Sequence, residues 1–117
     1  MAKLRSLKAL KRDALKAWGK VILTRYPKCV VCGEQSKHPH HLFPRSRYLH
    51  LQMDLRNGRG LCVRCHYAIH YDPIIPLLKI LSTDIHPALI TDARLGRRKN
   101  PYKRNELENI IIALKGA

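Results

Sequence analysis

The segments "CVVCGEQSKHPHH", residues 29–41, and "NGRGLCVRCHYAIH", residues 57–70, contain all the cysteines of the chain, in two Cys-x-x-Cys pairs. Two such pairs separated by a long stretch predict a tetrahedral zinc site more readily than disulfides, and Gly33 suits the tight turn after the first pair. Four thiolates fill the coordination sphere, so this Zn²⁺ is expected to stabilise the fold and not to catalyse. Mixed cysteine and histidine ligation is the alternative. The expected ligands are Cys29, Cys32, Cys62 and Cys65.

The chain is short and strongly basic. Its 117 residues are the length of one small domain, in which apolar burial alone leaves a modest stability margin that a metal site would raise. The 23 Lys and Arg residues against 8 Asp and Glu give a formal net charge of +15, which predicts a nucleic acid partner. A solvated basic surface is the plainer interpretation. An anionic membrane is the weakest one, because no basic amphipathic segment carries a large aromatic face.

The first twenty residues, "MAKLRSLKALKRDALKAWGK", are interrupted by a charge every few positions. They contain neither the apolar core of a signal peptide nor a membrane-length apolar span. Cysteines spaced for zinc also indicate a reducing compartment. Together these features predict a cytoplasmic protein with no membrane partner.

The apolar pattern predicts an α+β fold over a single domain, residues 1–117. Residues 1–25 repeat apolar side chains near helical spacing and are expected to form a basic helical region. Residues 26–72 contain short apolar runs between turn signals, which predict short strands around the zinc site. Residues 73–117 have the patterns of further helices. The zinc-containing core is therefore expected to be flanked by N- and C-terminal helices.

Local signals refine these elements. Trp18 is expected to be a core residue of the first helical region, which is predicted to be either one helix or two helices interrupted at Gly19. A helix of about two turns is expected from Cys65 to Pro73. Three helices are expected over "PIIPLLKILS", "PALITDARLG" and "NELENIIIALKG", with Asn105 as the cap of the last.

Seven histidines remain that a four-cysteine zinc site does not need. His66 and His70 are four positions apart, so on a helix their side chains project from one face and can meet one ion. His40 and His41 are adjacent, so on a strand they point to opposite faces and should have two different roles. The others, His38, His50 and His86, are expected to be ordinary surface or core residues.

The order of these residues along the chain resembles that of the HNH endonuclease family, also called His-Me finger or ββα-metal nucleases. The family's paired histidines correspond to His40 and His41, its middle asparagine to Asn57 in "DLRNGRGLC", and its last histidine to His66 in "LCVRCH". The resemblance covers residues 29–70 and implies a ββα-metal motif. In its compact form the chain looks like small phage-encoded members of the family.

The resemblance also implies roles for individual residues. His40 would bind the catalytic metal ion, and His41 would be the general base. His66 would bind the metal with it, and by analogy with the colicin nuclease domains His70 would do so too; phosphate contact is the alternative for His70. Asn57 would fix the loop between the two strands through hydrogen bonds, although Asn-Gly is also simply a good turn.

A set of arginines lies among these motifs. Guanidinium groups bind phosphate oxygens in pairs, and their positive charge would lower the pKa of a neighbouring histidine and keep it neutral near pH 7. As an alternative, some of them are only solvated. The expected phosphate-binding residues are Arg45, Arg47, Arg56, Arg59 and Arg64.

The function expected from these features is metal-dependent hydrolysis of DNA. A histidine general base and one divalent ion, Mg²⁺, Mn²⁺ or another, are sufficient for phosphodiester hydrolysis. The family resemblance implies products with 5′-phosphate and 3′-hydroxyl ends, and double-stranded DNA is the expected substrate. The alternative is a zinc-stabilised nucleic-acid-binding protein without catalytic activity, and a component of a ribonucleoprotein is a more distant third.

Overall fold

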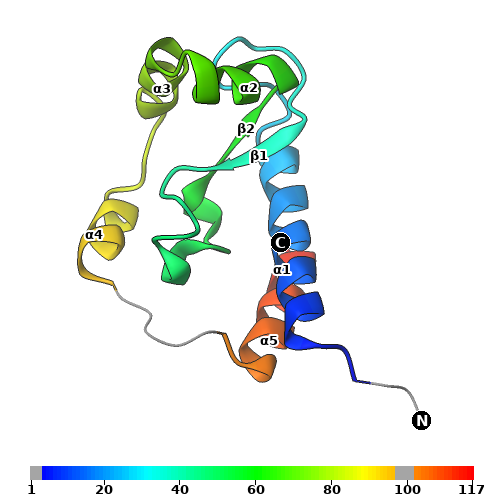
Figure 1. Ribbon diagram of the computed structural model, residues 1–117. Helices are drawn as coiled ribbons and strands as arrows, with labels where there is room; N and C mark the ends of the chain where they lie inside the picture. The colour runs from blue at the N-terminus through cyan, green and yellow to red at the C-terminus, as the bar shows by residue number, and fades with distance from the viewer. Residues whose placement is uncertain (1–3, 97–101) are drawn as a thin grey trace.

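The computed structural model describes residues 4–96 and 102–117, which form an α+β structure of five α-helices and one two-stranded antiparallel sheet (Figure 1). The predicted α+β class is therefore confirmed. Two short 3₁₀ turns, Leu49–Leu51 and Leu55–Asn57, lie between the strands. The elements are α1 (Leu7–Arg25), β1 (His38–His41), β2 (Gly58–Leu61), α2 (Val63–Tyr71), α3 (Ile74–Leu81), α4 (Pro87–Leu95) and α5 (Arg104–Lys115).

Helix α1 is continuous, so of the two alternatives the single helix is confirmed and the interruption at Gly19 is wrong. The helix begins after Ser6, whose hydroxyl accepts a hydrogen bond from the backbone N–H of Ala9 at 3.1 Å. Gly19 is buried inside the helix, where a Cβ atom would lie 3.0 Å from Cγ of Pro39. The missing side chain thus allows α1 to approach β1. The buried residues of the helix include Leu10, Ala14, Trp18 and Ile22.

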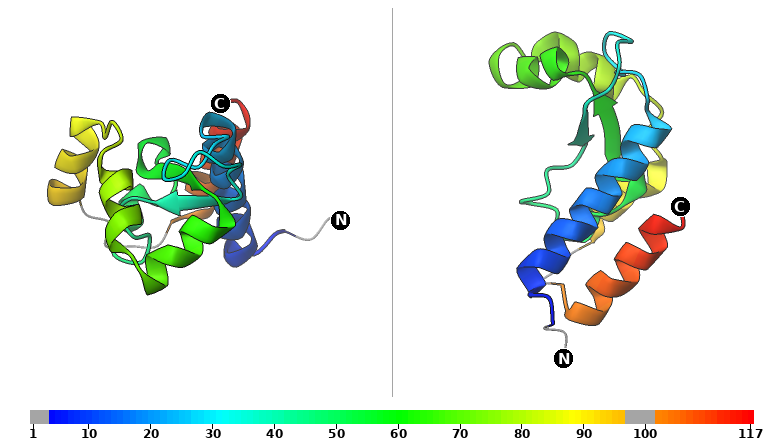
Figure 2. Two further views of the ribbon diagram at one scale, coloured as in Figure 1. Left: turned by 90° about the horizontal axis from the view of Figure 1, so that it is seen from above. Right: turned by 90° about the vertical axis from the view of Figure 1, so that its right-hand side faces the viewer.

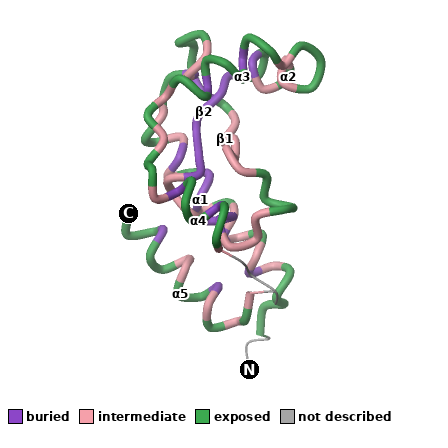
Figure 3. Tube along the Cα trace, turned by 90° about the vertical axis from the view of Figure 1, so that its left-hand side faces the viewer, coloured by how far each residue is buried: buried purple, intermediate pink, exposed green. Residues whose placement is uncertain are grey.

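The sheet places the paired histidines against α1 and α2. Strand β1 runs antiparallel to β2, with His41 opposite Gly58 and His38 opposite Leu61. Strand β2 is buried over its whole length, whereas β1 is half-buried (Figure 3). A Cβ atom on Gly58 would lie only 2.8 Å from Trp18, so this glycine is what lets α1 pack on the sheet.

Three apolar clusters hold these elements together. The largest joins α1 to α5, which lie side by side (Figure 2), through residues such as Leu10, Trp18 and Leu107. A second cluster joins the cysteines to β2 and α3, and a third joins α4 to the loop between the strands. Trp18 is 2 % exposed, which confirms its predicted place in the core.

The helices after the sheet follow the predicted order, with two corrections. Helix α2 begins at Val63 because the Sγ atom of Cys62 caps it by accepting a hydrogen bond from the N–H of Cys65. Helix α5 begins at Arg104, so Asn105 lies inside the helix and is not its cap. Within residues 4–96 and 102–117, no helix combines the length and the apolarity needed to cross a bilayer.

Candidate metal centre and histidine cluster

The four cysteines come together as the sequence predicts. Their Sγ atoms all lie within 4.8 Å of one another, and those of Cys32 and Cys62 are 3.5 Å apart. Tetrahedral zinc with Zn–S bonds of about 2.3 Å needs sulfur atoms about 3.8 Å apart, so the spacing suits such an ion. The group could therefore bind a metal ion such as zinc, as a closed four-thiolate site.

Local backbone structure positions each cysteine pair. Gly33 has φ of 82°, a left-handed conformation that favours glycine, and its N–H donates to the carbonyl of Cys29 at 2.9 Å. The backbone N–H of Val31 donates to Sγ of Cys29, and that of Cys65 donates to Sγ of Cys62, both at 3.4 Å. Donors aimed at sulfur stabilise thiolates, which are the form that binds metal.

The thiol pKa values also fit a cation at this position. Burial raises the pKa of Cys29, but hydrogen bonds from Cys62, Cys32 and Val31 outweigh it and lower the value to about 7. The pKa of Cys65 is raised, first by burial and then by the neighbouring thiols. Once one thiolate has formed, its close neighbours resist ionisation, because negative charges in one site repel each other unless a cation compensates them.

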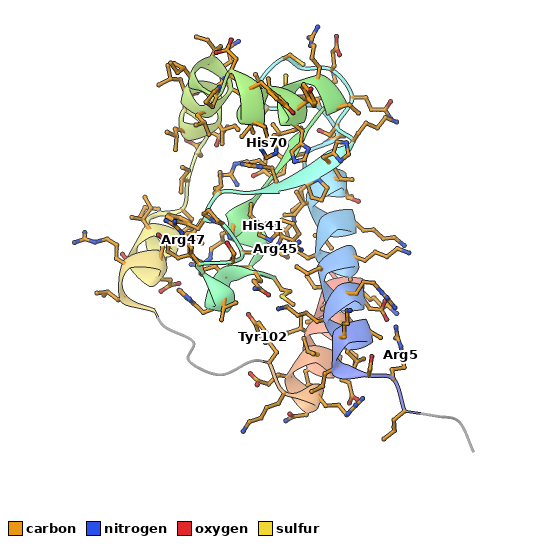
Figure 4. All side chains as sticks on the ribbon, in the orientation of Figure 1. Arg5, His41, Arg45, Arg47, His70 and Tyr102 are labelled. Carbon is orange, nitrogen blue, oxygen red and sulfur yellow. The ribbon has the colours of Figure 1, made fainter. Side chains whose placement is uncertain are left out.

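A histidine cluster lies where α2 crosses β1. The His66 ring stacks on that of His38 with centroids 4.8 Å apart, and lies edge-on to His40 at 6.2 Å and to His70 at 6.0 Å. Figure 4 shows His70 between α2 and β1. His38, expected to be an ordinary residue, is thus part of this cluster.

His40 and His66 have lowered pKa values, but the cluster is not a closed ligand set. Burial, and after it the neighbouring His66, His41 and His70, together lower the pKa of His40 to about 4. The pKa of His66 is lowered for the same reason, by burial first. Among the described residues, however, the four cysteines are the only group of three or more His, Cys, Asp or Glu side chains that could hold a metal ion. These imidazoles would have to turn toward one point to bind one.

His41 points away from this cluster, as alternation along a strand predicts. Its ring stacks on Trp18 with centroids 4.0 Å apart and planes inclined by 13°, and its Nε2 atom lies 2.8 Å from the carbonyl oxygen of Gln52. A carbonyl only accepts hydrogen bonds, so Nε2 carries the proton and Nδ1 keeps a lone pair. Burial lowers the pKa of His41, and the charge of Arg45 lowers it further against the raising effect of the Gln52 carbonyl.

Asn57 fixes the loop between the strands. Its side chain is fully buried and donates to the carbonyls of Phe43 at 3.1 Å and Leu51 at 3.0 Å, while it accepts from the N–H of Phe43 at 2.7 Å. Its own carbonyl accepts from the N–H of Leu42 at 3.0 Å. These are the hydrogen bonds expected of it, and they hold both ends of the segment between His41 and β2.

The arginines divide into two groups. Arg45, Arg47 and Arg64 are exposed, and Figure 4 shows Arg45 close to His41. Arg56 is half-buried and its guanidinium binds Asp54 at 2.6 Å and Asp92 at 2.7 Å. The two carboxylates largely neutralise its charge, and it is a weaker candidate for phosphate contact than Arg45 and Arg47. Arg64 lies between these cases, because it is exposed but pairs with Glu34 at 3.7 Å.

Arg59 corrects the expectation of a phosphate contact. It is 2 % exposed, and its guanidinium donates to Thr83 at 3.0 Å and to the carbonyls of Gly58 at 2.6 Å and Asp84 at 2.8 Å. It also lies over the ring of Tyr26, 5.2 Å from the centroid. Arg59 therefore ties β2 to the segment between α3 and α4 instead of facing solvent.

Comparison with known proteins assigns neither a family nor a function to this chain. No family model, curated protein or solved structure matches this chain. Its function is therefore inferred from its own residues.

The sequence does not predict the contacts of two residues, Gln52 and Trp18, with His41. Gln52 orients the ring through its backbone carbonyl, which no side-chain pattern can reveal. Trp18 was expected only as a core residue, because its helical spacing predicts burial but not which ring it stacks on. Both contacts join positions far apart in the chain, so only the folded structure brings them together.

Proposed function

We propose that this protein is a metal-dependent endonuclease of the HNH type that hydrolyses phosphodiester bonds in double-stranded DNA, leaving 5′-phosphate and 3′-hydroxyl ends. The observation that carries this proposal is the environment of His41. Its ring is neutral near pH 7 and fixed by Trp18 and by the Gln52 carbonyl, and Nδ1 keeps its lone pair. A general base requires an oriented, neutral acceptor of this kind.

In the proposed reaction, His41 accepts a proton at Nδ1 from the attacking water. The resulting imidazolium is stabilised by the hydrogen bond from Nε2 to the Gln52 carbonyl, which strengthens as the ring gains positive charge. Asn57 keeps the loop that contains Gln52 in place. Arg45 and Arg47 are exposed and would contact the DNA backbone.

His40, His66 and His70 would hold the catalytic divalent ion. Such an ion, when bound, supplies stabilisation of charge on the phosphoryl oxygens and on the leaving alkoxide. Neutral imidazoles suit ions such as Ni²⁺ better than Mg²⁺, which prefers oxygen ligands. The assay below therefore compares several ions.

The test is cleavage of supercoiled plasmid by the purified, zinc-loaded chain with Mg²⁺, Mn²⁺ or Ni²⁺. We expect nicked or linear products, and a loss of rate by a factor of about 10² to 10⁴ for His41→Ala with zinc content and DNA affinity kept. His86→Asn is the matched control, because the asparagine keeps the acceptor that caps α4. No cleavage with any ion, or equal rates for His41→Ala and wild type, would contradict the proposal.

A second function, a zinc-stabilised nucleic-acid-binding protein without catalytic activity, is favoured by a different observation. The cysteines are the only candidate metal group within residues 4–96 and 102–117. In that case the basic surface alone matters, and DNA binding should weaken steeply with salt. His41→Ala would then leave both zinc content and DNA binding unchanged, with no cleavage to lose.

A further inference from the structure

The outer face of α3 exposes large apolar side chains. Ile74 is 67 % exposed, Leu78 59 % and Leu81 64 %, whereas the buried residues of this helix are Pro76 and Ile80. At 100° per residue, the three exposed residues fall within a sector of about 60°, and the two buried ones lie on the opposite side. One side of the helix is therefore buried and the opposite side is exposed, and the exposed side is also apolar.

Helix α2 extends this face. Tyr67 and Tyr71 stack on each other with centroids 4.4 Å apart, and they are 61 % and 71 % exposed. Only Asp72 and Pro73 separate α2 from α3, and the two helices pack against each other at one end of the molecule (Figure 1). The residues Tyr67, Tyr71, Ile74, Ile75, Leu78 and Leu81 are called the α2–α3 apolar surface below.

The stretch of chain that carries this surface contains few charges, although Glu34, Lys37 and Arg64 lie beside Tyr67 at its edge. Residues 63–82 contain two cations, Arg64 and Lys79, and one carboxylate, Asp72, whereas the chain as a whole has a net charge of +15. By contrast, α1 alone carries six Lys and Arg residues against one Asp. DNA would gain little from this surface. A second copy of the same basic chain, however, could approach here with the least repulsion.

We propose that the α2–α3 apolar surface binds a second copy of this chain and forms a two-fold symmetric dimer. The six side chains are each between 58 % and 71 % exposed. Together they amount to on the order of 800 Å² of surface, about what each partner contributes to an interface of standard size. An interface in which each copy offers the same patch closes on itself and forms a dimer.

The dimer leaves the histidine cluster accessible. His66 and His70 lie one position before Tyr67 and Tyr71 on α2, and His66 turns toward His40 on β1. The docking side chains therefore project from a different side of α2 than the histidines. The inference does not depend on the proposed nuclease activity, since the dimer would form whatever the histidines do.

The test is the molar mass of the zinc-loaded 117-residue chain by light scattering and sedimentation equilibrium, over about 1 to 100 µM. We expect twice the chain mass of 13.5 kDa at the upper end of this range. Leu78→Glu and, separately, Ile74→Glu should give the mass of one chain, because a carboxylate would be buried between the copies. Both positions are exposed, so the variants should keep the helical circular dichroism of the wild type.

Ile112→Glu is the matched control, since Ile112 is 70 % exposed on α5, away from this surface. It should dimerise like the wild type. A monomer at every concentration, or dimers of unchanged strength in Leu78→Glu and Ile74→Glu, would overturn the proposal. So would a monomer that pellets with anionic phospholipid vesicles in a way that Leu78→Glu abolishes, because the surface would then bind membrane.

Discussion

At the scale of single residues, the position of His41 depends on Asp54. The indole N–H of Trp18 donates to the carbonyl of Asp54 at 2.9 Å, and the same Trp18 ring stacks on the ring of His41. The Asp54 side chain in turn accepts hydrogen bonds from the backbone N–H of Arg56 at 2.9 Å and from its guanidinium at 2.6 Å. One carboxylate thus orders the loop that holds the candidate base.

Replacing this carboxylate should reduce stability at neutral pH. Burial raises the pKa of Asp54, but the hydrogen bonds from Arg56 outweigh it and lower the value below 3.8. A lowered pKa means that the contribution is present above about pH 4 and is lost as pH falls through the folded-state value. We expect Asp54→Asn to cost about 1 to 2 kcal/mol in urea unfolding at pH 7, and the same amount at about pH 6, because the carboxylate is ionised in the folded protein at both values.

Glu108→Gln is the control for this measurement, because it removes an exposed carboxylate on α5. Both measurements stay at or above about pH 6, because protonation of the cysteines in stronger acid would release the metal. An unfolding free energy for Asp54→Asn equal to that of the wild type at pH 7 would refute the assigned role.

At the scale of elements, the packing of α1 on the sheet depends on glycine. Gly58 lies opposite His41 in the sheet, and a Cβ atom there would lie 2.4 Å from Cδ1 of Ile22 and 2.8 Å from Cζ2 of Trp18. Both distances are shorter than real Cβ contacts, so α1 or the strand would have to move. The residue that stacks on His41 is among those displaced.

Gly58→Ala should therefore destabilise the protein by about 2 kcal/mol, as expected for an extra methyl group in a tightly packed core. Unfolding in urea, followed by Trp18 fluorescence, measures this loss. Gly116→Ala is the matched control, because its nearest atoms would be 3.7 Å from the new methyl group. Equal stability of the two variants would show that α1 does not pack on β2 this closely.

The sequence predicts those elements whose residues are close together in the chain. Apolar periodicity predicts α1 and α3, and the Cys-x-x-Cys spacing predicts the cysteine cluster. The alternative of a break at Gly19 is wrong because a conformational preference was overridden by packing against Pro39. The burial of Arg59 cannot be predicted from the sequence for another reason. Strand β2 is short and buried over its whole length, so its sequence does not alternate between apolar and polar residues.

The candidate site is predictable to a similar extent. Alternation along a strand predicts that His40 and His41 face opposite ways, and the family resemblance gives Asn57 the hydrogen bonds that the structure contains. Nothing in the sequence indicates that Gln52 offers its carbonyl to His41. Whether the imidazoles of β1 and α2 can bind one ion together depends on the rotamers of these side chains. A pattern of residue types does not determine rotamers.

At the scale of the whole molecule, β2 connects two parts of the core. Leu61 packs with the cysteines and Ile80, while Gly58 at the other end packs against Trp18 and Ile22 of α1. The backbone of the cysteine region is bonded to the same strand, by Val30 N–H to the Gly60 carbonyl at 3.1 Å. Loss of order around the cysteines should therefore reach α1 through β2.

Metal removal should accordingly unfold more than the cysteine region. Binding of structural zinc contributes about 10 to 16 kcal/mol, which matches or exceeds the roughly 5 to 15 kcal/mol of net stability of a typical domain. We expect a chelator to reduce the helical circular dichroism and to change Trp18 emission together, and added Zn²⁺, but not Mg²⁺, to restore both. Cys32→Ser, with one thiolate fewer, should lose its metal at a lower chelator concentration. A chelated protein that keeps its helicity and its Trp18 emission would show that the four cysteines are not what holds β2 against α1.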